Sequence, residues 1–230
     1  VQSSFGNAGQ KCSATSLLIL TEDVFNNNEF KALLKDATKS KVFGNPWDYS
    51  TEIGPLAVQL SEKLKHVIQN TPDHQWLVKP KLNGNHMLTP GIIWDVTTAD
   101  YPYQNELFGP ILSVVKAKDL KDAVSIANNV AYGLTAGLES LDDNEIEYWD
   151  THIEAGNKYV NRSTTGAIVQ RQPFGGIKAS CFGFGMKAGG INYVLQFTNI
   201  KSKTTDWKED YQKWYDELFS KKIDYENQRG

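Results

Sequence analysis

The sequence predicts an α/β fold whose mostly parallel sheet is flanked by helices. From residue 111 onward, apolar strand-like segments alternate with amphipathic helix-like segments, a pattern typical of parallel strands joined by right-handed crossovers. The 230 residues are 40% hydrophobic and 22% charged, an ordinary globular composition that suffices for one large core or two small ones. No apolar run is long enough to span a bilayer.

The first part of the chain predicts one strand and two helices. Residues 16–20 are apolar and bounded by polar residues, which indicates a strand. One helix is expected from Glu22 to about Lys39, and another from Leu56 to Asn70. The expected inward faces are apolar, formed by Phe30, Leu33, Leu34 and Ala37 in the first helix and by Leu56, Leu60, Leu64, Val67 and Ile68 in the second.

The remaining elements follow from turn residues and periodicity. Turn-forming pairs at Asn83-Gly84 and Pro90-Gly91 separate expected strands at 75–79, 86–89 and 92–96. Beyond them we expect strands at 111–117, 134–139 and 158–161, and helices at 119–129 and 142–155, the latter capped by Asp142 or Asp143.

The last third of the chain contains a long irregular segment. Residues 162–192 are Gly-rich, and a loop of this length is more typical of a functional segment than of a simple connection. A final strand is expected at 193–200. It is followed by an amphipathic helix marked by Trp207, Tyr211, Trp214, Tyr215 and Leu218.

Charge and cysteine content exclude several classes of function. The net charge is −3 with acids and bases interspersed, so neither a nucleic acid nor a membrane is an expected partner. Two cysteines, Cys12 and Cys181, do not make a disulfide framework, which favours a reducing compartment. No metal site is expected, because no ligand-like spacing relates the four histidines His66, His74, His86 and His152.

Cys12 lies in a stretch that suits a reactive thiol, Phe5-Gly6-Asn7-Ala8-Gly9-Gln10-Lys11-Cys12-Ser13-Ala14. The thiolate is the nucleophilic form of cysteine, and neighbouring cations or backbone N–H groups favour it. Small residues leave room for a substrate to approach the sulfur. By themselves these residues leave two interpretations open, a nucleophile and a small buried cysteine that precedes a strand.

Three motifs occur in the order and at the spacing of one known family. They are Gly9-Gln10-Lys11-Cys12, Asn105-Glu106-Leu107-Phe108-Gly109-Pro110 and Gln172-Pro173-Phe174-Gly175-Gly176. Together they resemble the aldehyde dehydrogenase superfamily, and the resemblance implies the catalytic domain of that fold. It also implies that Cys12 attacks an aldehyde, giving a thiohemiacetal and then a thioester.

The same resemblance implies a nicotinamide cofactor. Glu106 would contact the ribose hydroxyls of NAD, and Phe108 would pack near the nicotinamide; the choice between NAD and NADP is left open. A carboxylate that accepts two hydroxyl donors suits this role. Without the other motifs, a solvated turn glutamate and a core phenylalanine are equally good interpretations.

The segment from Asn161 to Gly176 resembles the branch that oxidises L-glutamate γ-semialdehyde, Δ1-pyrroline-5-carboxylate dehydrogenase, which acts in proline degradation. The resemblance implies that Gly166 and Ala167 bind the substrate α-carboxylate through main-chain N–H groups, an arrangement suited to anions. Ser13 would add a hydroxyl to the same carboxylate, and Phe174 would pack on the methylene chain. The chain departs from this branch at Ile191, where a proline is usual.

The resemblance also predicts the domain organisation. Residues 1–192 would form the catalytic domain, and residues 193–230 an oligomerisation strand and helix of a dimer or larger homo-oligomer. The nucleotide-binding region, the general base and an oxyanion-binding asparagine would lie upstream of residue 1. The chain is therefore expected to be the C-terminal part of a longer protein, inactive by itself.

Three interpretations of function remain at this point. The first is oxidation of L-glutamate γ-semialdehyde, the second is oxidation of another aldehyde, and the third is a non-catalytic oligomerisation or interaction module. The expected location is the cytoplasm for a bacterial protein or the mitochondrial matrix for a eukaryotic one, without secretion.

Overall fold

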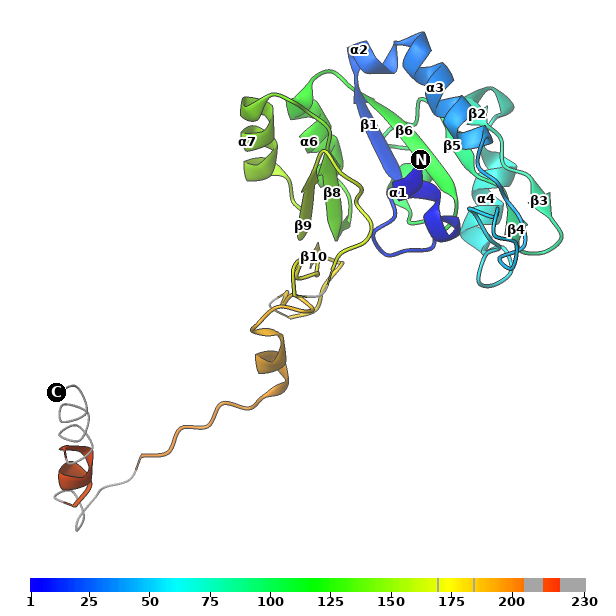
Figure 1. Ribbon diagram of the computed structural model, residues 1–230. Coiled ribbons are helices and arrows are strands. Elements are labelled where there is room, and N and C mark those ends of the chain that lie inside the picture. The colour runs from blue at the N-terminus through cyan, green and yellow to red at the C-terminus, as the bar shows by residue number, and fades with distance from the viewer. Residues whose placement is uncertain (169, 184, 205–212, 220–230) are drawn as a thin grey trace. The chain divides into compact units, whose positions relative to one another are not determined.

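The computed structural model describes residues 1–168, 170–183, 185–204 and 213–219. The chain divides into two compact units, Val1–Tyr193 and Val194–Gly230. All strands assigned in the described residues belong to the first unit, which carries the three motifs (Figure 1). Within those residues, no helix is both long and apolar enough for a membrane span.

A four-stranded sheet in the order β1-β6-β5-β2 forms the centre of the first unit. Its strands are β1 (Leu17–Thr21), β2 (Trp76–Val78), β5 (Gly91–Ile93) and β6 (Ile111–Ala117). β6 pairs in parallel with both β1 and β5, while β2 pairs antiparallel with β5 at the edge. Six of the seven residues of β6 are buried, which explains why this central strand is almost continuously apolar. The prediction of a mostly parallel sheet is confirmed.

The helices of the first part differ from the sequence prediction. Two helices, α2 (Glu22–Phe25) and α3 (Asn28–Lys39), replace the single one expected over 22–39. The side chain of Asn27 causes the break, because its Oδ1 accepts from the main-chain N–H groups of Glu29 and Phe30 at 2.9 and 3.1 Å and so starts a new helix. Leu33, expected to face inward, is 62% exposed.

The second predicted helix is also shorter than expected. Helix α4 spans Glu62–Asn70 and is capped by the Ser61 hydroxyl. Leu56 precedes it in an irregular segment, where its N–H donates to the carbonyl of His86 at 2.8 Å. Leu56 is therefore buried from an irregular segment and not from a helix. Leu56 and Leu64 still share one hydrophobic core.

A smaller layer lies beside the four-stranded sheet (Figure 1). It contains α6 (Leu120–Asn128), β8 (Thr135–Leu138), α7 (Asp143–His152) and β9 (Asn157–Val160), with β8 and β9 parallel. Asp142 caps α7, as one of the two predicted alternatives. The layer has its own apolar cluster, centred on Val124, Trp149, Ile153 and Ala155.

Short elements complete the unit. Two two-stranded pairs are antiparallel: β3 (Leu82–Asn83) with β4 (Met87–Leu88), and β7 (Tyr132–Gly133) with β10 (Ile177–Lys178). Single turns of helix are α1 (Gln2–Phe5), η1 (Gly6–Gly9), η2 (Asp73–Gln75) and α5 (Tyr101–Gln104). The predicted irregular segment 162–192 holds only β10 among its described residues.

The strand expected at 193–200 is absent from this structure. Tyr193–Phe197 instead forms a 3₁₀ helix, η3, followed by residues without regular structure. A strand needs a neighbouring strand to satisfy its N–H and C=O groups. Here local bonds serve instead, such as Thr198 N–H to the Leu195 carbonyl at 3.1 Å. Of the expected C-terminal helix, 213–219 is helical, and Trp207 and Tyr211 lie outside the described residues.

Candidate active site

Cys12 lies in a tightly coiled loop between η1 and β1. Three consecutive residues before it adopt left-handed backbone angles, with φ of 56° at Asn7, 54° at Ala8 and 66° at Gly9. This conformation is costly for residues other than glycine, so the surrounding contacts must hold it. Cys12 is exposed, whereas Ser13 beside it is buried. The thiol is thus presented at the surface by a loop that is anchored on both sides.

The first anchor is the close approach of Gly9 to the second motif. A Cβ added to Gly9 would lie 2.6 Å from the carbonyl carbon of Gly109 and 2.9 Å from the nitrogen of Pro110. Only a residue without a side chain allows this backbone contact. The motifs around Cys12 and Glu106 are therefore packed together, although they are far apart in the sequence.

Gln10 provides a second anchor, and sequence analysis assigned it no role. Its side-chain Oε1 accepts from the N–H of Ala57 at 2.8 Å, and its Nε2 donates to the carbonyl of Phe108 at 3.2 Å. An amide carries its acceptor and its donor on two separate atoms, so this one side chain makes both bonds. The loop two residues before the thiol is thereby tied to the main chain of the predicted cofactor motif.

Glu106 and Phe108 both point away from the core. Leu107 between them is only 6% exposed, whereas Phe108 is 46% exposed and Glu106 is exposed. Phe108 has a φ of +50°, an uncommon angle for a bulky residue that marks a constrained backbone. An exposed carboxylate and an exposed ring, separated by one buried residue, form a surface next to the Cys12 loop that suits a bound ligand.

Hydroxyl groups hold the 163–165 segment against the other side of the Cys12 loop. The Thr164 hydroxyl donates to the carbonyl of Ser13 at 3.0 Å, and the Ser3 and Ser163 hydroxyls lie 3.0 Å apart. Thr15 and Thr164 are also joined through their hydroxyls, at 3.0 Å. These hydroxyls were not among the predicted site residues; the run Ser163-Thr164-Thr165 is the sequence signal that marks them.

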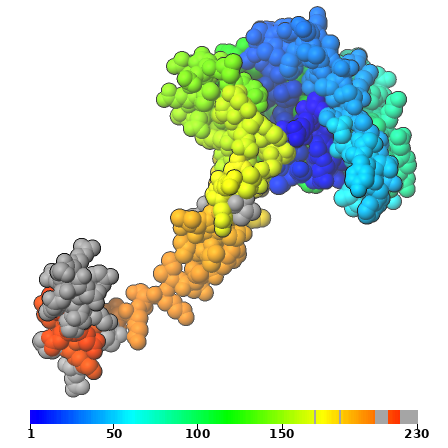
Figure 2. All heavy atoms as spheres, in the orientation of Figure 1, coloured from blue at the N-terminus to red at the C-terminus, as the bar shows by residue number. Residues whose placement is uncertain are grey.

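Figure 2 agrees with these contacts. The dark blue N-terminal segment lies between the light-blue segment near residue 57 and the yellow segment near residue 165. The structure thus brings the Cys12 loop together with the predicted cofactor motif and with the start of the predicted substrate loop.

The predicted carboxylate-binding residues follow directly after this hydroxyl cluster. Gly166 is exposed, has a φ of +89° and would accept a Cβ without any atom within 4 Å. Ala167 is half-buried. The left-handed angle explains the glycine, and the residue itself is exposed.

Phe174 is half-buried, and main-chain hydrogen bonds pair it with Ala188 in an isolated antiparallel bridge. Its N–H donates to the Ala188 carbonyl at 2.9 Å, and its carbonyl accepts from Ala188 at 2.8 Å. The next carbonyl, of Gly175, accepts from the ammonium of Lys187. Burial lowers the pKa of Lys187, and the nearby Cys181 opposes that shift. The main-chain hydrogen bonds of Phe174 go to Ala188 and not to the Cys12 loop, so its predicted substrate role rests on the motif.

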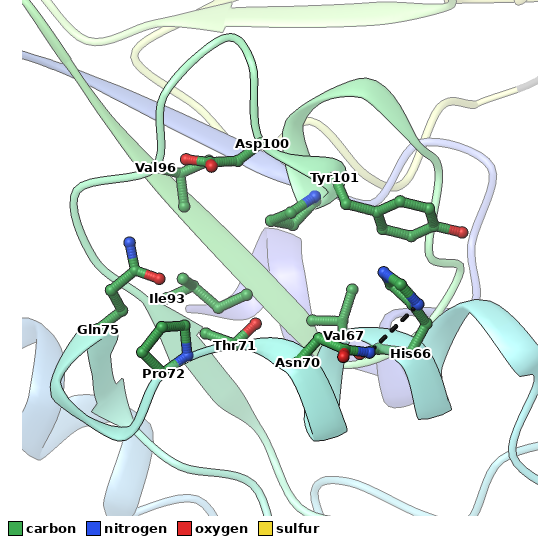
Figure 3. Close-up of a pocket in the computed structure, with 11 residues that line it drawn as sticks. His66, Val67, Asn70, Thr71, Pro72, Gln75, Ile93, Val96, Asp100 and Tyr101 are labelled. Atoms are coloured by element: carbon green, nitrogen blue, oxygen red, sulfur yellow. Dashed lines mark hydrogen bonds between the residues drawn. The ribbon is translucent and has the colours of Figure 1, made fainter.

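A pocket of about 200 Å³ lies elsewhere in the first unit (Figure 3). Its lining comes from α4, the turn that follows it, β5 and the start of α5. His66 and Tyr101 both line it, with ring centroids 4.3 Å apart and ring planes tilted by 45°, and His66 is hydrogen-bonded to Asn70. None of the predicted site residues lines this pocket. Across the described residues, no three histidine, cysteine or carboxylate side chains gather in a metal-binding arrangement.

Comparison with known proteins extends these observations. The profile of the aldehyde dehydrogenase family matches residues 1–203. The 1-pyrroline-5-carboxylate dehydrogenase of Bacillus subtilis is 36% identical over 209 residues, which cover 89% of this chain and 39% of that protein. A Geobacillus protein of the same name is also 36% identical, over 88% of this chain and 39% of its own length.

Solved structures give the same result. Proline utilization A from Corynebacterium freiburgense matches with a TM-score of 0.81 and 42% identity over 92% of this chain and 23% of its own. A Thermus 1-pyrroline-5-carboxylate dehydrogenase with bound NAD matches with a TM-score of 0.74 and 31% identity, over 85% of this chain and 38% of its own. The chain therefore spans about two fifths of the dehydrogenases it matches. With two of the three motifs packed together beside one exposed thiol and a match over 203 of its 230 residues, this chain belongs to the aldehyde dehydrogenase family.

Proposed function

We propose that this chain is the catalytic part of an NAD(P)-dependent L-glutamate γ-semialdehyde dehydrogenase, with Cys12 as the nucleophile. The observation that carries the proposal is the position of the Cys12 loop. It is bonded on one side to Phe108 of the cofactor motif and on the other to Thr164 of the substrate loop. The relatives named 1-pyrroline-5-carboxylate dehydrogenase support the same substrate class.

In this proposal the exposed Cys12 thiolate adds to the aldehyde carbon and forms a tetrahedral thiohemiacetal. The main-chain N–H of Cys12 stabilises the oxyanion. NAD held by Glu106 and Phe108 would supply the acceptor for the hydride of the aldehyde carbon. Water then hydrolyses the resulting thioester and frees the thiolate, so that one aldehyde, one NAD⁺ and one water yield a carboxylate, NADH and two protons.

The residues of the second motif fit a nicotinamide nucleotide. The Glu106 carboxylate is exposed and can accept hydrogen bonds from two ribose hydroxyls. The Phe108 ring is exposed beside it and offers an apolar face to a nicotinamide. Both lie next to the Cys12 loop through the Gly9–Gly109 contact.

At the opposite side, Gly166 and Ala167 would hold the substrate carboxylate through main-chain N–H groups, assisted by the Ser13 hydroxyl. A carboxylate bound to N–H donors is a charge-assisted interaction of about twice the strength of a neutral hydrogen bond. Phe174 would pack on the intervening methylene groups. An aldehyde without a carboxylate would lose this anchor and would be a poorer substrate.

Because the chain spans about two fifths of its relatives, we propose that a general base and an oxyanion-binding asparagine come from an upstream half of a longer protein. The test is NADH formation from L-glutamate γ-semialdehyde by residues 1–230 and by the full-length protein that contains them. Cys12→Ala is the informative variant, and Cys181→Ala is its matched control, since these are the only two cysteines. Butanal serves as the aldehyde without a carboxylate.

Turnover in the full-length protein that Cys12→Ala abolishes and Cys181→Ala preserves would support the nucleophile. A clear preference for the semialdehyde over butanal would support the substrate class. Equal turnover of both aldehydes would point to a dehydrogenase of other specificity. Absence of turnover with either aldehyde in the full-length protein would contradict an enzymatic role and favour an interaction module.

A further inference from the structure

Thr164 lies between the nucleophile loop and the loop proposed to hold the carboxylate. Its hydroxyl donates to the carbonyl of Ser13, which directly follows Cys12. Gly166 comes two residues after Thr164 in the chain. Consecutive Cα atoms are about 3.8 Å apart. This single hydrogen bond therefore links a residue next to the thiol with a residue two positions before the proposed carboxylate anchor.

The orientation of the Thr164 side chain is fixed from two directions. Its methyl group packs on β8, where a Cβ added to Gly137 would come within 3.0 Å of it. A β-branched side chain has few rotamers. Because the methyl group of Thr164 packs against β8, the hydroxyl is directed toward Ser13. A hydroxyl carries one hydrogen, which Thr164 gives to Ser13, and Thr15 is therefore the donor in the Thr15–Thr164 pair.

The main chain of Thr164 is held as well. Its N–H donates to the Ser3 hydroxyl at 3.3 Å, and the same Ser3 oxygen lies 3.0 Å from the hydroxyl of Ser163. The segment that leads into Gly166 is thus bonded through side chain and backbone to the Cys12 side of the site. Beyond Thr165 the loop is open to solvent at Gly166.

We propose that Thr164 is a positioning residue that sets the span between the Cys12 sulfur and the N–H groups of Gly166 and Ala167. By fixing this span it selects aldehydes according to the distance between their carbonyl carbon and their carboxylate. The inference rests on the proposed function, because it takes Gly166 and Ala167 as the carboxylate anchor. Attack requires reacting atoms about 3–3.5 Å apart, so an anchored substrate of the wrong length leaves its carbonyl out of reach.

Alkylation of Cys12 tests this inference without cofactor or turnover. The reagents are N-iodoacetyl derivatives of glycine, β-alanine and γ-aminobutyrate, each compared with its neutral N-methylamide. In every case the thiolate displaces iodide, so that a carbon–sulfur bond forms, the carbon–iodine bond breaks and iodide leaves. The reactive carbon is the same throughout. In the glycine reagent it is separated from the carboxylate by as many bonds as in the semialdehyde, and the other two are longer by one and two methylene groups.

The proteins compared are residues 1–230 with Thr164, Thr164→Val and Thr164→Ser, all carrying Cys181→Ser so that one thiol reacts. Valine keeps the branched shape on β8 and removes the hydroxyl, whereas serine keeps the hydroxyl and removes the methyl. With Thr164, the glycine reagent should react about tenfold faster than its methylamide, and the longer reagents should show less advantage. Thr164→Ser, which keeps the hydroxyl and loses the methyl contact, should keep part of this length preference, and Thr164→Val should lose it, each measured as the ratio of the carboxylate rate to the methylamide rate.

Two results would overturn the inference in different ways. A Thr164→Val protein with a length preference as strong as that of Thr164→Ser would refute the positioning role and leave the anchor intact. Equal rates for carboxylates and methylamides at every length in the Thr164 protein would refute the anchor itself, and with it the proposed substrate class. Urea unfolding of each variant identifies any that reacts from an unfolded state.

Discussion

Replacing Gly9 by alanine should destabilise the first unit far more than the same replacement at Gly84. Both glycines have a φ of +66°, so alanine pays the same backbone penalty at each, about 1 kcal/mol. They differ in their surroundings. A Cβ at Gly84 has no atom within 4 Å, whereas one at Gly9 meets the main chain of Gly109 and Pro110 at 2.6 and 2.9 Å.

Backbone atoms cannot rotate out of the way as a side chain can. Ordinary contact begins at 3.4 Å, so one of the two segments around Gly9 must move by about 1 Å, and overpacking of this kind costs about 1–3 kcal/mol. We therefore expect Gly9→Ala to lower the free energy of unfolding by about 2–4 kcal/mol, against about 1 kcal/mol for Gly84→Ala.

Urea unfolding followed by tryptophan fluorescence measures this difference. With a denaturant dependence of about 2 kcal/mol per M, an excess of about 2 kcal/mol separates the two midpoints by about 1 M. The rate of Cys12 alkylation should also change in Gly9→Ala and stay constant in Gly84→Ala, because only Gly9 positions the thiol loop. Equal unfolding free energies for the two variants would refute the close packing of the two motifs.

Two further replacements test the core. Tyr103→Phe should cost about 1–2 kcal/mol, because the buried hydroxyl donates to the main-chain carbonyl of Ile126, whereas Tyr49→Phe at the surface should be neutral. Burial raises the pKa of Tyr103 above its ordinary value, so its contribution is complete below about pH 10 and is lost as the pH rises through the folded-state pKa. Unfolding measured from pH 8 to 11 should thus show a smaller alkaline loss of stability in Tyr103→Phe, and parallel curves would contradict this account. Leu64→Ala should lower the free energy of unfolding by about 2–5 kcal/mol, because Leu64 is 1% exposed. Leu33→Ala should change it by less than about 0.5 kcal/mol, because Leu33 is 62% exposed. Similar losses for the two variants in thermal or urea unfolding would mean that α4 is not packed as described.

Local sequence signals predicted most of the elements. Residues 111–117 were expected as a strand and form β6 with the same bounds, because a short, largely apolar segment between turn residues marks a buried strand. Predictions were wrong where periodicity does not show what decides the structure, such as a single capping side chain or a partner strand. Asn27 starts a new helix inside a segment that is otherwise helical in its periodicity. The 193–200 segment has strand-like residues, but pairing depends on a partner that its own sequence does not supply.

The sequence by itself determined the α/β class, the three motifs and the candidate nucleophile, because periodicity, turn chemistry and residue order are properties of neighbouring residues. Only the tertiary structure decided how the motifs meet. Gly9 packs on Gly109, and Thr164 reaches Ser13 across 151 positions of the chain. Such contacts depend on how the strands pair and the layers pack, and no short stretch of sequence encodes the distance between two segments that folding brings together.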